Sequence, residues 1–277
     1  MIAILLLPLS ACGLIAIGYN YADAYLRYSI NRYASFNDEQ RDAIKKEVNI
    51  YMKWHRKNML AEYVSFLQEL QQVAQSGMPL TIPEVARFRT SVRALYVKTL
   101  QPTISPAAKL LSSVDAGQVQ ELVQSFAKEN NKQRDKELSG SADEQLRKRA
   151  ERTVDFLENL VGSLKDDQLE KIREINRSLP FATGIYISQR ENNQAGLIEL
   201  LKNKKGEDEI TAFLSSWLLT PEASRKPDER SIMLAFENTA DEMIVTLYQM
   251  LTERQKKTLL RNIIKYSDIF QDLMEKA

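Results

Sequence analysis

The sequence predicts an all-α protein, an elongated multi-helix bundle with one long helix near its N-terminus. Only nine glycines and eight prolines occur among 277 residues, which puts glycine well below the usual share of about 7%. The abundant residue types, Leu, Ala, Glu, Lys, Gln and Arg, are good helix formers. Apolar residues recur every three or four positions, whereas alternating segments typical of strands are essentially absent. The 44% hydrophobic content allows a real core.

The longest predicted helix covers residues 37–75. One of its faces is apolar over the whole length and carries Ile44, Val48, Tyr51, His55, Met59, Phe66, Leu70 and Val73. Gly77 and Pro79 end this helix, because glycine favours the left-handed position after a helix and proline cannot continue one. At 1.5 Å per residue the helix is ~58 Å long.

The other predicted helices are separated by short turn signals. They cover residues 22–33, begin at Thr81 and Asp115, flank a Ser-Gly-Ser loop at 139–141, and cover residues 165–178, 182–202, 207–219, 228–251 and 252–274. Thr81 and Glu84 can cap the second of these reciprocally. Pro102 and Pro106 interrupt or kink the same helix.

Charge gives no indication of a nucleic-acid partner. The formal net charge is only +1, so no global field attracts acidic ligands. The most basic stretch interleaves Arg147, Lys148, Arg149 and Arg152 with Asp143, Glu144 and Glu151. Such interleaving predicts a solvated helix face rather than a patch for nucleic acid or acidic lipid.

The N-terminal residues resemble a bacterial lipoprotein signal. Residues 1–9 are apolar, Ser10 and Ala11 are small, and the only cysteine of the chain, Cys12, follows them. Leu-Ser-Ala-Cys is similar to the lipobox of these proteins, although no Lys or Arg precedes Arg27 and a signal normally has a basic start. The resemblance implies that Cys12 becomes the N-terminus and carries diacylglycerol and an N-acyl chain, which anchor stably. Gly13 favours the outer membrane, because an Asp there tends to retain a lipoprotein in the inner membrane.

Two other interpretations of this segment stay open. Residues 1–17 could be a transmembrane anchor, although they fall short of the ~20 residues needed and contain Pro8. They could also form a buried core helix with an inert cysteine, since free cysteines are often buried.

These features divide the chain into three parts. A signal peptide is expected at residues 1–11, a lipid-anchored segment at 12–36 and a helical domain at 37–277, with sub-boundaries near 139–141 and 221–227. The expected location is the periplasmic face of the bacterial outer membrane. The expected partners are the membrane, through the lipid on Cys12, and another envelope protein; nucleic acid is not expected.

An aromatic stripe follows the candidate anchor. Ile17, Tyr21, Tyr25 and Tyr28 recur at helical spacing. One interpretation is a belt at the membrane interface, where tyrosine suits both apolar and polar surroundings. The other is that the stripe packs on the domain, as such stripes usually do.

One helix-start pattern occurs four times, at residues 36–40, 114–118, 164–168 and 251–255. Each copy has an apolar residue, a cap, two further residues and a glutamine, with another apolar residue four positions later. In a capping box the cap side chain accepts from the backbone N–H of the glutamine, and the glutamine side chain accepts from the N–H of the cap. Lys165 is the exception, because a lysine side chain cannot accept a hydrogen bond.

Leu251-Thr252-Glu253-Arg254-Gln255 resembles the Leu-Thr-x-x-Gln motif of small periplasmic stress-response chaperones, and the other three copies match it loosely. Those chaperones are helical and ATP-independent, and they cradle unfolded clients. A chaperone-like function is therefore an alternative, although four ordinary helix starts would give the same pattern.

Several N-terminal segments together resemble an uncharacterised family of proteobacterial lipoproteins. They are Gly18-Tyr19-Asn20-Tyr21-Ala22-Asp23, Asn31-Arg32-Tyr33, Asp38-Glu39-Gln40-Arg41 and Trp54-His55-Arg56 with Leu60 and Tyr63. Ala61 departs from the pattern, in which proline commonly follows the leucine. The resemblance implies an all-helical envelope lipoprotein and carries no activity.

The sequence predicts no catalytic residue, no cofactor site and no metal site. A zinc site would need several ligands, and only His55 and Cys12 are available. Nucleophile-elbow, P-loop, dinucleotide-binding and EF-hand sequences are absent. A carboxylate pair could act without histidine, but 37 acidic residues single out no pair. We therefore expect a non-catalytic binding or structural protein, and a carboxylate-based hydrolase is the least expected class.

His55 has two interpretations. It falls on the apolar face of the long helix beside Trp54 and Tyr51, where a histidine is usually packed. A pH-sensing role is the alternative, because histidine titrates near neutrality.

Overall fold

The structure, a computed structural model, describes residues 12–275, with side chains from residue 15 onward. The signal peptide predicted at residues 1–11 lies outside these residues, as does the side chain of Cys12. Every regular element between residues 12 and 275 is helical, which confirms the prediction of an all-α multi-helix bundle with a long N-terminal helix. The elements are α1 (Cys12–Asn20), α2 (Ala22–Asn31), α3 (Asp38–Ser76), α4 (Ile82–Leu100), η1 (Gln101–Thr103), α5 (Ile104–Ser112), α6 (Ala116–Leu138), α7 (Ala142–Val161), α8 (Asp166–Ser178), α9 (Thr183–Lys202), α10 (Glu207–Leu219), η2 (Pro221–Ser224), α11 (Pro227–Gln249) and α12 (Glu253–Glu275).

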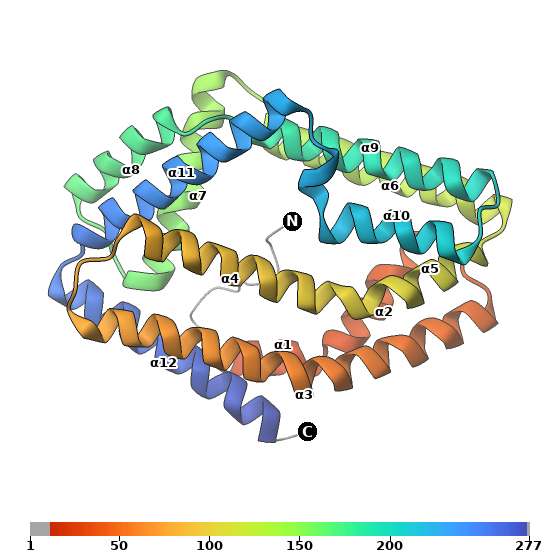
Figure 1. The fold of residues 1–277 in the computed structure, drawn as a ribbon, viewed down its shortest axis with the longest axis horizontal. Coiled ribbons are helices and arrows are strands. Elements are labelled where there is room, and N and C mark those ends of the chain that lie inside the picture. The colour runs from red at the N-terminus through yellow and green to blue at the C-terminus, as the bar shows by residue number, and fades with distance from the viewer. Residues whose placement is uncertain (1–11, 276–277) are drawn as a thin grey trace.

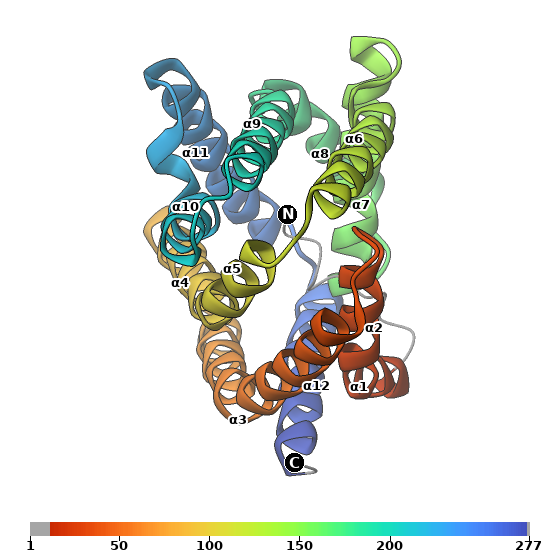
Figure 2. The same cartoon turned by 90° about the vertical axis from the view of Figure 1, so that its right-hand side faces the viewer.

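The long helices run along the longest axis of the molecule. Figure 1 shows α3 and α4 side by side along one long edge and α6 and α9 along the opposite edge. At one end α8 contacts both α7 and α11, and α12 packs along α3. Figure 2 shows that α1 and α2 lie on the outside of the molecule, on the side away from α4, α5 and α10.

Helix α3 passes through three apolar clusters and so connects the parts of the bundle. Ile44, near its start, belongs to the largest cluster, which also contains residues of α5, α6, α9 and α10. Leu60 packs with Leu273 of α12, and Phe66 packs against the cluster that contains Phe88 of α4. Burying one such side chain contributes about 1.5–3 kcal/mol to folding. The predicted apolar face of α3 therefore contacts all three clusters and connects them.

Both ends of α3 form as predicted. Asn37 Oδ1 accepts from the N–H of Gln40 at 2.9 Å, and Gln40 Oε1 accepts from the N–H of Asn37 at 3.0 Å. Gly77 ends the helix with φ +68°, a conformation that costs a residue with a Cβ atom free energy. Thr81 and Glu84 form the predicted reciprocal cap at the start of α4.

The tyrosine stripe stays on the surface, so the interpretation that it packs on the domain is wrong. The exposed fractions are 68% for Tyr21, 68% for Tyr25 and 62% for Tyr28. The other face of α2 meets the body instead, because Leu26 and Ile30 pack against the largest cluster.

Arg149 also departs from the prediction of a solvated basic face. It is half-buried, and its Nη2 atom donates to the carbonyl oxygens of Leu179, at 3.1 Å, and Asn176. These carbonyls lie at the end of α8, where backbone acceptors lack partners within the helix. Arg147 behaves as predicted, since it is exposed and pairs with Glu151 at 2.7 Å.

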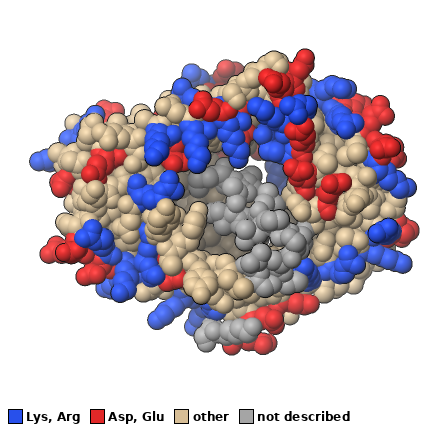
Figure 3. Space-filling model, turned by 180° about the vertical axis from the view of Figure 1, so that it is seen from behind, with Lys and Arg blue, Asp and Glu red and all other residues tan. Residues whose placement is uncertain are grey.

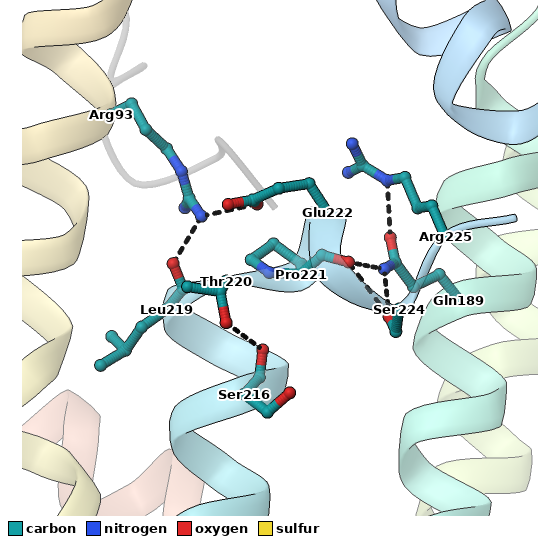
Figure 4. A network of polar contacts seen from close by, with 9 residues as sticks. All are labelled: Arg93, Gln189, Ser216, Leu219, Thr220, Pro221, Glu222, Ser224 and Arg225. Atoms are coloured by element: carbon teal, nitrogen blue, oxygen red, sulfur yellow. Dashed lines mark hydrogen bonds and ion pairs between the residues drawn. The ribbon is translucent and has the colours of Figure 1, made fainter. Parts of the chain in front are cut away.

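The segment after α10 is tied to its neighbours on both sides (Figure 4). Arg93 of α4 pairs with Glu222 at 3.1 Å. Gln189 of α9 donates to Ser224 Oγ at 3.0 Å. The sub-boundary near 221–227 stays a prediction, but these contacts hold the segment between α4 and α9.

Candidate functional site

The Trp-His-Arg triplet lies in the middle of α3 and joins it to three other helices. His55 Nδ1 lies 2.8 Å from the hydroxyl of Tyr19 on α1, and His55 Nε2 lies 3.3 Å from the hydroxyl of Tyr63. That hydroxyl lies 2.7 Å from Thr99 Oγ1 on α4. Because a neutral imidazole has one donor and one acceptor nitrogen, it can bond both phenols at once.

Arg56 makes the connection to α12. Its Nη1 atom donates to the carbonyl oxygen of Leu273 at 3.1 Å, and its Nη2 atom donates to Asn20 Oδ1 at 2.9 Å. The guanidinium lies 5.1 Å from the ring centroid of Tyr19, a cation–π distance. Leu273 belongs to the last turn of α12, whose carbonyls have no partner within the helix. Arg56 thus holds the end of α12 and the end of α1 on α3.

Aromatic and aliphatic side chains surround these hydrogen bonds. The ring centroids of Trp54 and Tyr51 are 5.9 Å apart, and those of Trp54 and His55 are 6.5 Å apart. The hydroxyl of Tyr51 donates to the carbonyl oxygen of Thr99 at 3.3 Å. Leu60, four residues after Arg56, is buried and packs with residues of α1 and α12. We call this cluster, built from Tyr19, Tyr51, Trp54, His55, Arg56, Tyr63 and Thr99, the anchor junction.

Burial keeps the titratable rings of the anchor junction uncharged at neutral pH. Desolvation lowers the pKa of His55 to about 4, so its imidazole is neutral. Burial raises the pKa of Tyr19 to about 12, although the nearby Arg56 charge opposes this shift. Burial also raises the pKa of Tyr51 and of Tyr63. Arg56 therefore supplies the positive charge next to a neutral hydrogen-bonded network.

The anchor junction is suited to holding helices together. An acid–base catalyst needs a pKa near the working pH and a proton within reach in the substrate, whereas both nitrogens of His55 face tyrosine hydroxyls. In the described part of the chain, no three His, Cys, Asp or Glu side chains are grouped to hold a metal. The arrangement fixes the position of α1 on the body, and this is the chemistry it supports.

Cys12, the predicted lipidation site, is the first residue of α1. Seven residues of helix, about 10 Å, separate it from Tyr19 in the anchor junction. From Cys12 to Glu275 the structure contains no helix with the length and apolarity needed to cross a membrane. Cys12 thus belongs to the same helix as Tyr19, which the anchor junction holds on α3.

The repeated helix-start motif forms two glutamine pairs. Gln40 and Gln118 each donate from Nε2 to the Oε1 atom of the other, at 3.1 and 2.7 Å. Gln40 Nε2 also donates to the carbonyl oxygen of Ser113, and Gln118 Nε2 to that of Ser35, both at 3.0 Å. Each acceptor residue lies two positions before the cap of the partner helix. The starts of α3 and α6 are thus joined symmetrically.

The same arrangement joins α8 and α12. Gln168 and Gln255 exchange side-chain hydrogen bonds of 2.9 and 2.8 Å. Gln168 Nε2 donates to the carbonyl oxygen of Met250 and Gln255 Nε2 to that of Ser163, at 2.8 and 3.0 Å. The four glutamines are at most 6% exposed. The glutamines of the chaperone-like motif are therefore used inside the fold.

Sequence reasoning found the triplet and Tyr63 but missed part of the anchor junction. Tyr19 belongs to the Gly-Tyr-Asn segment, and nothing in that segment indicates its bond to His55. Thr99 carries no local signal, because it lies on a different helix and meets Tyr63 across 36 residues of chain. The glutamine motif is visible in the sequence, whereas the pairing of the glutamines depends on contacts over 78 and 87 residues.

Charged side chains are mixed on the face shown in Figure 3, where basic and acidic groups alternate over most of the visible surface. Elsewhere on the surface, ion pairs such as Arg152 with Glu137, at 3.1 Å, join residues of opposite charge.

Comparisons with known proteins identify the chain only at the level of a family. No curated protein matches the sequence, and no solved structure matches it. Residues 32–230 match DUF6279, a family of unknown function. The matched segment contains the Trp-His-Arg triplet and the Gln40–Gln118 pair, and it covers well over half of the chain. The protein therefore belongs to the DUF6279 family, whose function is unknown.

Proposed function

We propose that this protein is a lipid-anchored, non-catalytic binding or structural protein of the bacterial envelope, attached through Cys12 to the periplasmic face of the outer membrane. The lipobox-like residues before Cys12 support the anchor. The proposal also includes membership in the lipoprotein family that the Gly-Tyr-Asn and Trp-His-Arg segments resemble.

The anchor junction is the observation that carries this proposal. A lipid on Cys12 would enter a helix whose far end is fixed by Tyr19 and Asn20 to His55 and Arg56. The body would then sit at a defined orientation to the membrane rather than on a loose tether. A fixed orientation suits a protein that presents one helical face to another envelope component.

The first experiment compares the full chain with its Cys12→Ala variant in a Gram-negative host. We expect the wild type to lose residues 1–11, to carry acyl mass on Cys12, and to float with outer membranes on a density gradient. The variant should lack the acyl mass and leave the outer-membrane fraction. An uncleaved wild type without acyl mass would overturn the proposed anchor.

The binding role is tested separately by crosslinking in intact cells. An envelope-binding protein should give one discrete crosslinked partner, and the same partner should disappear when Cys12→Ala displaces the protein. If no discrete partner is captured, the binding role fails even where the anchor holds.

The chaperone-like alternative rests on the Leu251–Gln255 resemblance. A chaperone of that kind should slow the aggregation of a reduced model client at near-stoichiometric amounts without ATP. The buried position of Gln255 makes this glutamine a fold element, so its substitution should reduce stability whether or not clients bind.

A further inference from the structure

The outer face of α1 and α2 carries a row of large exposed side chains. Ile17, Tyr21, Tyr25 and Tyr28 follow one another at intervals of four, four and three residues, which places them on one helical face. More than half of each side chain is exposed. We call this row the tyrosine face. Ala24, also exposed, lies within it.

The tyrosine face spans two adjoining helices, α1 and α2, which we together call the rod. They meet at Tyr21, whose φ of −102° and ψ of 6° lie outside the helical range. The N–H of Tyr21 donates to the carbonyl oxygen of Ile17 at 3.1 Å, and the N–H of Tyr25 donates to that of Tyr21 at 3.0 Å. Backbone hydrogen bonds therefore continue across the boundary between α1 and α2. At 1.5 Å per residue the row from Ile17 to Tyr28 is about 16 Å long, and Cys12 lies about 8 Å before it.

The opposite side of the rod is already occupied. Ile15, Ala16 and Tyr19 pack against the cluster formed by α3 and α12, and Leu26 and Ile30 pack against the largest cluster. The rod cannot turn its tyrosine face inward without giving up these contacts. The face that remains outside is thus fixed relative to the body.

Tyrosine suits the boundary between lipid and water. Its ring is apolar while its hydroxyl can remain hydrated, so tyrosines concentrate where membranes meet water. Arg32 lies 5.9 Å from the ring centroid of Tyr28, and its guanidinium pairs with Glu129 of α6 at 3.2 Å. Asp23 pairs with Arg27 at 2.9 Å and therefore adds no unpaired acidic charge beside the row.

We infer that the tyrosine face lies in the headgroup region of the same bilayer that holds the lipid on Cys12, so that the rod rests flat on the membrane and sets the orientation of the body. This inference rests on the proposed function, because the lipid brings the rod to the membrane. The length of the rod supports the inference: a rod standing upright would carry Tyr28 about 24 Å away from Cys12.

The test uses the acylated full chain in phosphatidylethanolamine–phosphatidylglycerol vesicles. Because Cys12 is the only cysteine and is blocked by acylation, Ala24→Cys gives one free thiol inside the tyrosine face. An environment-sensitive fluorophore on this thiol should shift to the blue and be quenched several-fold more by lipid-borne than by water-borne quenchers. The matched control is Ala235→Cys on α11, an exposed alanine next to the exposed Leu234, whose label should stay in water.

A second pair of variants separates the side chains from the anchor. In the Ala24→Cys background, Tyr21→Ser, Tyr25→Ser and Tyr28→Ser together should return the label to water while flotation persists. The control triple, Ile232→Ser, Leu234→Ser and Ile244→Ser, removes comparable exposed apolar groups from α11 and should leave the label in lipid. Circular dichroism confirms that both triples remain folded.

The outcomes distinguish the two proposals. If the protein floats but the label at residue 24 stays in water, the tyrosine face does not contact lipid and only the anchor survives. If the acylated protein does not float, the anchor fails and the inference fails with it. If the label is shielded in detergent and the mass doubles with concentration, the tyrosine face is an interface between two copies and the inference is wrong.

Discussion

Gln40 and Gln118 exchange two side-chain hydrogen bonds, at 3.1 and 2.7 Å, across 78 residues of chain. The Oε1 atom of each glutamine also accepts from the cap of its own helix, at 3.0 Å in Asn37 and 3.1 Å in Asp115. A single side chain therefore starts one helix and joins it to another. The pair of α8 and α12 repeats this arrangement, and Figure 1 shows that these two helices begin at the opposite end of the molecule from α3 and α6.

Substituting one glutamine of a pair should destabilise the fold strongly. Gln118→Ala removes a buried side chain and leaves the polar groups of Gln40 and Ser35 without their partner. We expect the free energy of unfolding to fall by about 3 kcal/mol, from lost hydrogen bonds and an unfilled cavity. Urea unfolding measures this change. Gln120→Ala, an exposed glutamine on the same helix, should change stability by less than about 0.5 kcal/mol.

The double variant tests whether the two glutamines act as a pair. Once Gln40 is alanine, Gln118 has already lost its partner. Adding Gln118→Ala to Gln40→Ala should therefore cost less stability than Gln118→Ala alone, by at least about 1 kcal/mol. Fully additive losses would show that the reciprocal hydrogen bonds contribute little to stability.

Local signals predicted the helices well because they act over a few residues. The cap at Asn37 and the left-handed Gly77 bound α3 as expected, and the apolar period of the sequence identified the face of α3 that enters the core. These features need no knowledge of the rest of the chain. The sequence could therefore predict the fold class and nearly all helix positions.

The features that the sequence could not predict depend on contacts between residues far apart in the chain. Arg149 sits in a charged pattern typical of solvent, yet the end of α8 supplies carbonyls that it can bind. The tyrosine face has the period of a packed stripe, and only the position of α2 shows that Leu26 meets the core instead. Likewise, the sequence marks His55 as an unusual residue, while its partner Tyr19 comes from a different helix, α1.

Titration of His55 should make stability depend on pH. Its pKa is about 4 in the folded protein, against an ordinary value of about 6.5 in the unfolded chain. Between these values the unfolded state binds one more proton, so this contribution is full above pH 6.5 and is lost as the pH falls toward 4. The wild type should lose up to about 3 kcal/mol more over this window than His55→Gln, which cannot titrate. Parallel unfolding curves for the two proteins would contradict the burial of a neutral imidazole.

Arg56 should control the attachment of α1. Arg56→Ala removes the bonds to Leu273 and Asn20, and Arg56→Lys keeps the charge but cannot span both acceptors. In hydrogen exchange, the amides of α1 should open roughly tenfold more often in both variants, equivalent to about 1.4 kcal/mol. The control is Lys57→Ala, because Lys57 is exposed on the same turn of α3. Unchanged exchange in α1 would show that packing alone holds the rod.

The ion pair of Arg89 and Asp241 gives an asymmetric prediction, because only the carboxylate is buried. Asp241 is 2% exposed and accepts from Arg89 Nε and Nη2, at 3.2 and 3.0 Å. Arg89→Ala leaves this carboxylate buried without a counter-charge and should cost about 3–5 kcal/mol near pH 7. Asp241→Ala should cost less, because Arg89 keeps its 2.7 Å bond to Glu237. The control is Lys98→Ala on α4, the helix that carries Arg89. It breaks the exposed ion pair with Glu62 of α3 and should cost less than about 1 kcal/mol. Urea unfolding of all three variants near pH 7 checks the ranking. Equal losses for Arg89→Ala and Lys98→Ala would mean that water reaches Asp241.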